Sequence, residues 1–369
     1  MAVRDDIIAF KAYYEKCKAR LEGVLLEFNR ELMDDGDPIR RTLLTDMADL
    51  GEGGKLLRGM LVSLGYAIGG GADESYSDAL ALSYEIFQTA ILIHDDIIDN
   101  AKLRRGKVTI HERLKSRFAG RADDADVTDA AKGAALCVGD YGLYMANMKI
   151  AQAYAADPHL GELLRYFDGT VLRTIRGELL DVMLPWEMLD SLMEEDEKKE
   201  LLQKSVWDIY HLKTACYSVI GPLHLGMILA GAPREQMEAM DRFAAETGTA
   251  YQIMDDILGI YADAGHIGKD VGVDIAEFKQ TILWMYVRVN CPDAARELLK
   301  YYGKKDVTEE SLREVRRIFT DSGALAYAHN ALEERIYTAE AALDDMEFLS
   351  PDTRNVLRGF AQWCAGRSR

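Results

Sequence analysis

This chain contains five segments of helical length, and many of them carry apolar residues around most of their circumference. Separated by stretches rich in Gly, Pro, Asp and Ser, they cover residues 78–99, 130–156, 160–184, 201–230 and 234–258. A helix on a protein surface carries one apolar stripe, whereas a helix that is apolar on most sides is surrounded by other elements. Strand-like alternation is hard to find, and Pro occurs at only 7 of 369 positions. We therefore expect an all-α fold, a single large helical bundle over residues 1–369.

Charge and cysteine content exclude several classes of protein. The formal net charge of −18 argues against a nucleic-acid binder, which would show a basic face. The 5 cysteines are odd in number and lack metal-ligand spacing, so they indicate neither a disulfide framework nor a zinc site. The N-terminus is too charged for a signal peptide, and no apolar run approaches the roughly 20 residues of a membrane span. We expect a cytoplasmic protein.

Two aspartate clusters each end a long apolar segment. The segment ALALSYEIFQTAILIHDDIID ends in Asp95, Asp96 and Asp99, and DRFAAETGTAYQIMDDILG ends near Asp255 and Asp256. Carboxylates are disfavoured at a helix C-terminus unless a cation joins them, and residues four apart share a helix face. A single cluster would be equally compatible with a metal site and with a solvated helix end. Two clusters favour one shared site for Mg²⁺, which binds one or two carboxylates together with substrate phosphates.

Basic residues lie close to these clusters in the sequence. They could bind phosphate groups, either from a Gly-rich loop or as paired arginines that fork onto a diphosphate. Simpler explanations remain open: GGK as an ordinary loop, the arginines as partners of the helix-end carboxylates, and Lys213 with a buried carboxylate. The residues are Lys55, Arg58, Arg104, Arg105, Lys213, Lys269 and Lys279. Together with an apolar core, they indicate a substrate with a charged head and an apolar tail.

These motifs, in this order, resemble those of the trans-type polyprenyl synthetase family, which includes farnesyl- and geranylgeranyl-diphosphate synthases. The similarity covers most of the chain and includes GGKLLRG, EIFQTAILIHDDIIDNAKLRRGKVTIH, VGDYGLYMA, IRGELLD, HLKTA, YQIMDD and GKDVGVDI. It implies the isoprenoid-synthase helical bundle with a central active-site cavity, and a homodimer. It also implies condensation of isopentenyl diphosphate with an allylic diphosphate (dimethylallyl, geranyl or farnesyl), with three Mg²⁺ ions per active site.

The resemblance assigns roles position by position. It implies that Asp95, Asp96, Asp99, Asp255 and Asp256 hold Mg²⁺. The residues that match the isopentenyl diphosphate site are Gly54, Lys55, Arg58, Gln88 and Arg105. Those that match the allylic diphosphate site are Arg104, Lys213, Lys269 and Lys279, and Thr214 and Gln252 match polar groups near the developing carbocation.

Three positions depart from the commonest family pattern. Gly59 stands where a proline follows the arginine, Gly259 replaces the last aspartate of the second motif, and Phe278 occupies a glycine position before Lys279. Part of the family shares the glycine in the second motif, so that change does not indicate lost activity. Phe278 makes the role of Lys279 less secure than that of Lys269.

The resemblance also implies that residues one or two turns before Asp95 line a tunnel for the growing tail and set the product length. Short-chain members of the family often carry aromatic residues at the positions of Ala90 and Ile91. Ala90 predicts an open tunnel and a product of geranylgeranyl length or somewhat longer. Phe87, about one turn deeper, is the candidate floor of that tunnel, and ordinary core packing is an equally good interpretation of it.

Two other functions compete with chain elongation. A terpene cyclase would share the fold but lack an isopentenyl site, so Lys55, Arg58 and Arg105 argue against it. A catalytically silent regulatory subunit would tend to lose aspartates, and both clusters are present here. The acidic residues 187–200 could bind a partner, but a solvated helix face or loop is the simpler interpretation.

Overall fold

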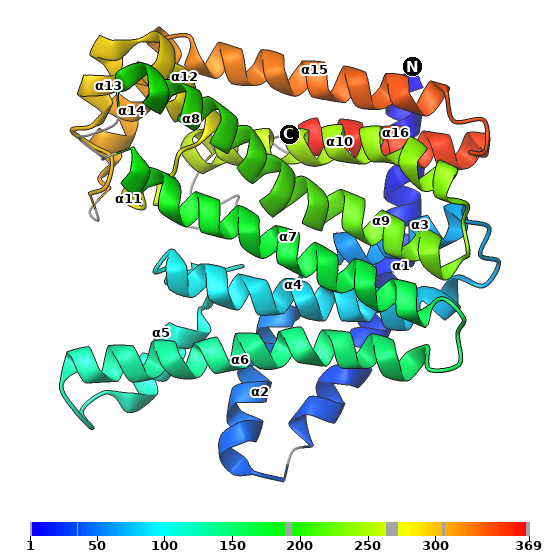
Figure 1. Cartoon of the computed structure of the whole chain (residues 1–369). Coiled ribbons are helices and arrows are strands. Elements are labelled where there is room, and N and C mark those ends of the chain that lie inside the picture. Colours follow the sequence, from blue (N-terminus) through cyan, green and yellow to red (C-terminus); the bar gives the residue numbers. More distant parts are fainter. Residues whose placement is uncertain (1, 35, 189–193, 263–271, 305–306, 367–369) are drawn as a thin grey trace. The chain divides into compact units, whose positions relative to one another are not determined.

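The computed structural model describes residues 2–34, 36–188, 194–262, 272–304 and 307–366, and these fold almost entirely into helices (Figure 1). The strands among them are β1 (Leu103–Arg104) and β2 (Lys107–Val108), which form one short antiparallel hairpin. The all-α prediction is therefore confirmed. The chain divides into two compact units, and the expected single domain over residues 1–369 stays a prediction.

Unit 2 comprises Tyr13–Asp168 and Pro222–Ala232. It contains the β-hairpin, most of α1 (Ala2–Met33), α2 (Pro38–Gly51), α3 (Leu57–Ile68), η1 (Glu74–Ser77), α4 (Asp78–Ile98), α5 (Ile110–Phe118), α6 (Asp124–Ala153), the start of α7 (Leu160–Glu187) and most of α9 (Gly221–Leu229). The first aspartate cluster lies at the C-terminal end of α4, as the sequence predicts.

Unit 1 comprises Met1–Ala12, Gly169–Gly221 and Pro233–Arg369. It contains the rest of α7, α8 (Glu195–Ile209), the π-helical segment η2 (Tyr210–Ile220), α10 (Arg234–Tyr261), α11 (Val273–Ala276), α12 (Ile282–Asn290), α13 (Pro292–Leu298), α14 (Glu309–Asp321), α15 (Ala324–Asp344) and α16 (Pro351–Ala365). The second aspartate cluster lies near the C-terminal end of α10.

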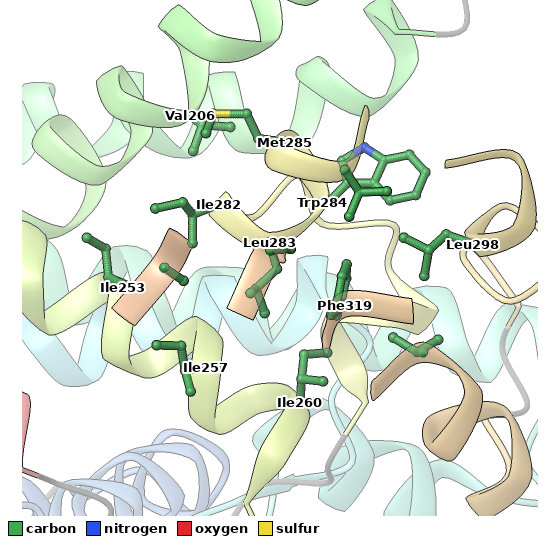
Figure 2. Packing of buried hydrophobic residues seen from close by; sticks show 14 of the residues in the cluster. Val206, Ile253, Ile257, Ile260, Ile282, Leu283, Trp284, Met285, Leu298 and Phe319 are labelled. Carbon is green, nitrogen blue, oxygen red and sulfur yellow. The ribbon is translucent and has the colours of Figure 1, made fainter. Parts of the chain in front are cut away.

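The core of unit 1 explains why the second cluster has a fixed place. Ile253, Ile257 and Ile260 recur at helical spacing on α10, and Figure 2 shows them with side chains of α12 and α14 in one apolar cluster. Ile282 and Leu283 contribute from the first turn of α12 and are fully buried. This packing fixes the rotation of α10 about its axis, and with it the directions of the acidic residues between the isoleucines.

Close backbone approach holds α3 and α9 together in unit 2. A Cβ atom at Gly65 would lie 2.0 Å from the carbonyl oxygen of Leu223, and a Cβ at Gly226 would lie 2.0 Å from that of Val62. Only glycine fits at either position, because the atoms that a side chain would meet belong to the backbone.

Two acidic stretches that read as breaks in the sequence instead begin helices. α6 starts at Asp124, ahead of the segment predicted to begin at residue 130, with Asp124 and Asp126 in its first turn. α8 starts at Glu195, where a reciprocal capping box joins Glu194 and Glu197. Carboxylates near a helix N-terminus are stabilised by its partial positive charge. Within the described part of residues 187–200, this geometry favours a solvated helix face, the simpler interpretation of that acidic stretch.

One helical stretch of the described chain, Glu195–Leu229, has the length and hydropathy to cross a membrane. It begins ahead of the segment predicted at residues 201–230, because α8, η2 and α9 are continuous. Of its apolar window, 89% is buried inside the protein, which is the pattern of a core helix.

We expect Gly65→Ala to lower the free energy of unfolding by at least about 2 kcal/mol, because α3 and α9 must separate to admit the methyl group. Gly133→Ala is the matched control: it also lies in a helix of unit 2, and no atom lies within 4 Å of its added Cβ. The free energy of unfolding of Gly133→Ala should be unchanged or higher by up to about 1 kcal/mol. Urea unfolding followed by circular dichroism measures both, and equal effects would contradict the tight crossing.

Candidate active site

The aspartates at the end of α4 are held by an arginine from the β-hairpin. Arg104 Nε donates to Asp96 Oδ1 at 2.7 Å, and its Nη2 donates to Asp95 Oδ2 at 2.7 Å. Burial lowers the pKa of Arg104, but the two carboxylates outweigh this effect and raise it. Asp99 is the C-cap of α4 and is half-buried. The structure thus joins Arg104 to the carboxylates, as the simpler interpretation of the paired arginines proposed.

Arg105 contacts the C-terminal end of α2 and lies beside Gly54 in the loop that precedes α3. Its Nη1 donates to the carbonyl oxygen of Leu50 at 3.0 Å, and a Cβ at Gly54 would lie 2.9 Å from the same nitrogen. Gly54 therefore leaves the space in which the guanidinium lies against the loop. Arg105 and Leu56 both adopt left-handed backbone conformations, with φ of 54° and 49°. Backbone strain of this kind concentrates at functional sites.

The other residues predicted for the isopentenyl site all lie in unit 2. Lys55 is exposed, Arg58 is half-buried in the first turn of α3, and Gln88 is buried on α4. The backbone carbonyl of Lys55 accepts a hydrogen bond from Tyr14 Oη at 2.7 Å. This bond ties the loop to α1.

A buried glutamate that sequence reasoning missed organises this part of unit 2. Glu85 accepts a hydrogen bond from the backbone N–H of Gly59 at 2.7 Å. Burial raises the pKa of Glu85, and the Gly59 N–H and the guanidinium groups of Arg58 and Arg105 oppose this shift. Proline has no N–H to donate, so the contact gives a physical reason for Gly59 in place of the usual proline. A charged residue inside an apolar helix was the available signal.

In unit 1, one carboxylate holds two of the predicted phosphate-binding lysines. Lys213 Nζ lies 2.7 Å from Asp181 Oδ2 and 2.8 Å from Glu178 Oε2, and Lys279 Nζ lies 3.0 Å from the same oxygen of Asp181. Burial alone would raise the pKa of Asp181, but the two ammonium groups lower it to about 2. Sequence reasoning allowed a carboxylate partner for Lys213 but did not name Asp181 or Glu178, although both lie in the IRGELLD motif.

Glycines on both sides fix the π-helical segment that carries Lys213. A Cβ at Gly177 of α7 would lie 2.4 Å from the backbone nitrogen of Lys213, and a Cβ at Gly248 of α10 would lie 2.5 Å from Cα of Ala215. π-helical turns are rare, and those that occur often lie at functional sites. No feature of the sequence signalled the π-helical turn at η2.

The second aspartate cluster belongs to a chain of hydrogen bonds between side chains. Thr214 Oγ1 donates to Gln252 Oε1 at 2.6 Å, and Gln252 Nε2 donates to Asp256 Oδ1 at 2.7 Å. The other carboxylate oxygen of Asp256 accepts from the hydroxyl group of Tyr210. Burial and the nearby carboxylate of Asp274 raise the pKa of Asp256. Asp255, its neighbour on α10, is half-buried.

Two departures from the usual motif have a steric explanation. A Cβ at Gly259 would lie 2.5 Å from the carboxylate oxygen Oδ2 of Asp274, so Asp274 occupies the space of the missing side chain. Phe278 has a φ of 56°, so its backbone adopts a conformation typical of the glycine usual at this position. Lys269 lies outside the described residues.

The candidate chain-length residues lie in unit 2. Phe87 is fully buried in an aromatic trio, with its ring centroid 5.5 Å from that of Tyr84 and 5.4 Å from that of Phe167. Ala90 is also fully buried against α6, where a Cβ at Gly142 would lie 2.9 Å from the Cβ of Ala90. Ile91 is half-buried. The packing of Phe87 agrees with the core interpretation and leaves its role as a tunnel floor a prediction.

Among the described residues, no group of three His, Cys, Asp or Glu side chains is arranged to hold a metal ion. A cation here would therefore need oxygen ligands from a substrate or water. Mg²⁺ has this preference, since it is usually bound through one or two carboxylates plus phosphate oxygens.

Comparison with known proteins identifies the family. The family model for polyprenyl synthetase matches residues 41–319, and the chain belongs to that family. Geranylgeranyl diphosphate synthase from Sulfolobus acidocaldarius is 27% identical over 322 residues, covering 86% of this chain and 88% of that protein. All-trans-nonaprenyl-diphosphate synthase from Rhodobacter capsulatus is 28% identical, covering 82% and 81%.

A solved structure is similar over nearly the whole chain. Geranylgeranyl pyrophosphate synthase from Corynebacterium glutamicum, complexed with isoprenyl diphosphate and magnesium, aligns with a TM-score of 0.83 and 25% identity. The alignment covers 97% of this chain and 99% of that one. These similarities confirm the predicted family and fold, and the predicted class of enzyme, a prenyltransferase.

We expect Asp181→Asn to destabilise the protein by about 2–3 kcal/mol at neutral pH, because Lys213 and Lys279 lose a largely buried counter-charge. The pKa of Asp181 is lowered on folding, so its contribution is complete above its unfolded pKa of about 3.9. The difference in free energy of unfolding between variant and parent should therefore stay constant down to about pH 5 and shrink as the pH falls toward about 2. Urea unfolding at a series of pH values measures it.

The control is Asp293→Asn, which removes an ion pair to Arg296 from a side chain that is 95% exposed. It should leave the unfolding midpoint unchanged. A difference for Asp181→Asn that did not depend on pH below about 4 would contradict the ion-pair explanation.

Proposed function

We propose that this chain condenses isopentenyl diphosphate with an allylic diphosphate to give an all-trans prenyl diphosphate one unit longer. The observation that carries the proposal is that the largely buried carboxylate of Asp181 holds two candidate phosphate-binding cations, Lys213 and Lys279, in unit 1. In unit 2, the buried carboxylate of Glu85 interacts electrostatically with Arg58 and Arg105. Fixed cations of this kind stabilise charge on a departing diphosphate. Family membership supports the same reaction.

The isopentenyl diphosphate site is assigned to Gly54, Lys55, Arg58, Gln88 and Arg105 in unit 2. Arg58 and Arg105 interact electrostatically with Glu85, and Arg105 is held by the carbonyl oxygen of Leu50, while Lys55 is exposed on the loop before α3. A guanidinium that is already oriented loses less side-chain entropy when it binds a phosphate. This arrangement favours a prenyl synthase over a terpene cyclase, which has no second diphosphate to bind.

The allylic diphosphate is assigned to Lys213 and Lys279, with Lys269 and Arg104 by family resemblance. Arg104 uses Nε and Nη2 for its bonds to Asp96 and Asp95. A guanidinium has five N–H donors, so Arg104 can hold the aspartates and still contact a phosphate.

Mg²⁺ is assigned to the two aspartate clusters. Asp95 and Asp99 are four residues apart at the end of α4 and only partly buried, and Asp255 is similarly placed on α10, which suits an ion that shares its ligands with a substrate. Asp96 and Asp256 are buried and bound to protein donors, so they support the ligands. When bound, Mg²⁺ neutralises charge on the diphosphate oxygens. Three ions per active site, and one site shared by both clusters, stay predictions.

In the reaction, the C–O bond of the allylic diphosphate breaks, and the double bond of isopentenyl diphosphate attacks the resulting cation. A proton then leaves the new chain, with the released diphosphate as its acceptor. Lys213 and Lys279 stabilise the negative charge on the leaving group. Thr214 Oγ1 donates a hydrogen bond to Gln252 Oε1, so the oxygen lone pairs of Thr214 remain available to the allylic cation.

A homodimer is supported by exposed apolar side chains within each unit. In unit 1 they follow one face of α7 at helical spacing: Leu172, Ile175, Leu179, Met183 and Trp186. In unit 2 they lie on α6: Leu136, Tyr141, Tyr144 and Met148. Apolar surface of this extent is typical of subunit interfaces.

Product analysis tests the function and its alternatives together. The purified protein is incubated with Mg²⁺, labelled isopentenyl diphosphate and each of dimethylallyl, geranyl and farnesyl diphosphate. We expect products of geranylgeranyl length or somewhat longer, and none after chelation of Mg²⁺. Products that end at farnesyl diphosphate would contradict the predicted length. Cyclic hydrocarbons would identify a cyclase, and failure to elongate any primer would favour the regulatory subunit.

We expect Phe87→Ala to lengthen the product by one or more isoprene units, because it removes a fully buried ring from the aromatic trio. Chromatography of the products measures the shift. Phe319→Ala is the control, an equally buried ring in unit 1. Both variants lose about 3–5 kcal/mol of stability, so Phe87→Leu is included as a milder change. An unchanged product distribution in both Phe87 variants would remove this residue from chain-length control.

A further inference from the structure

Tyr210, the first residue of η2, makes two hydrogen bonds that no motif of the sequence signals. Its hydroxyl group donates to Oδ2 of Asp256 and accepts from the backbone N–H of Ile282 at 2.8 Å. The ring is buried, with an edge contact to Trp207 at 5.7 Å between centroids. A buried hydroxyl group is costly unless it is hydrogen-bonded, so these two bonds give the oxygen its place in the core.

Asp256 is thereby held by three donors. The Ile282 N–H also lies 3.4 Å from its Oδ2, and Gln252 Nε2 donates to its Oδ1 at 2.7 Å. A carboxylate bound on both oxygens keeps one orientation. The acidic end of α10 is consequently fixed at Asp256, the residue next to the candidate metal ligand Asp255.

The same hydroxyl group fixes the segment that carries Lys279. Ile282 begins α12, three residues after Lys279, whose ammonium group is bound to Asp181 at 3.0 Å. The segment from 279 to 282 is therefore anchored at its start by Asp181 and at its end by Tyr210. Lys213, also bound to Asp181, follows Tyr210 by three residues in η2.

We propose that Tyr210 is a positioning residue that keeps the acidic end of α10 in register with Lys279 and Lys213. A magnesium diphosphate needs the carboxylates and the ammonium groups at the same time, and a single hydroxyl group joins the elements that supply them. The proposal rests on the proposed function and adds a residue that selectively supports the allylic diphosphate. The isopentenyl site is assigned to unit 2 and does not depend on this bond.

Tyr210→Phe removes the hydroxyl group and keeps the ring. Tyr302→Phe is the matched control: its ring is also buried in unit 1, stacked on Trp284 at 4.7 Å, and its hydroxyl group makes no hydrogen bond within the described residues. The two variants therefore make the same chemical change in similar surroundings, and only one breaks the proposed connection.

Three measurements are made on the full chain. Hydrogen exchange followed by mass spectrometry reports the amide of Ile282, calorimetry measures binding of inorganic pyrophosphate with Mg²⁺, and steady-state kinetics give KM for each substrate. For Tyr210→Phe we expect faster exchange at Ile282 and about tenfold weaker binding of magnesium pyrophosphate, the effect of one lost hydrogen bond to a charged group. KM for the allylic diphosphate should rise about as much, with KM for isopentenyl diphosphate unchanged.

The proposal is overturned if pyrophosphate binding and exchange at Ile282 match the parent protein, or if both KM values rise together, as general destabilisation would cause. It is equally overturned if Tyr302→Phe has the same effects. If the parent protein elongates no primer, the proposed function fails, while exchange and pyrophosphate binding still decide the role of Tyr210. A parent protein that does not bind magnesium pyrophosphate would contradict both.

Discussion

Pairing of buried charge is the constraint on which the candidate site depends. Cations that bind phosphate have to be held in place before the substrate arrives, and holding them inside a helical core requires a carboxylate beside them. Asp181 does this for Lys213 and Lys279, and the buried carboxylate of Glu85 interacts electrostatically with Arg58 and Arg105. Arg104 reverses the arrangement, since a buried guanidinium holds Asp95 and Asp96. Asp181 keeps its charge because the two ammonium groups lower its pKa.

The helices that carry these groups were predictable because their apolar faces recur at helical spacing. Both aspartate clusters lie near helix ends, as predicted from their position at the end of a long apolar segment. The starts of α6 and α8 were not predictable by the same rule, because runs such as Asp123, Asp124 and Asp126 resemble loops until their stabilising position at a helix N-terminus is recognised. Spacing along one segment also says little about contacts between distant segments. Asp181, Glu85 and Tyr210 therefore emerged only from the structure.

The departures from the family pattern show how local changes are compensated. The backbone N–H of Gly59 donates a hydrogen bond to Glu85, and Phe278 adopts a positive φ typical of glycine while its ring packs against Trp284 and Tyr302. Phe278 alone made the role of Lys279 less secure, whereas the structure binds Lys279 to Asp181. The backbone conformation of a motif is thus a better guide to its function than its exact residue identities.

The contact between Gly259 and Asp274 has a consequence for how this chain can evolve. Because the Asp274 carboxylate lies in the space that a side chain at 259 would need, any such side chain requires the Asp274 side chain to rotate away or to be replaced. Aspartate at 259, the commoner family form, therefore calls for a different arrangement of residue 274. The two positions are coupled, and variation at one is best interpreted together with the residue at the other.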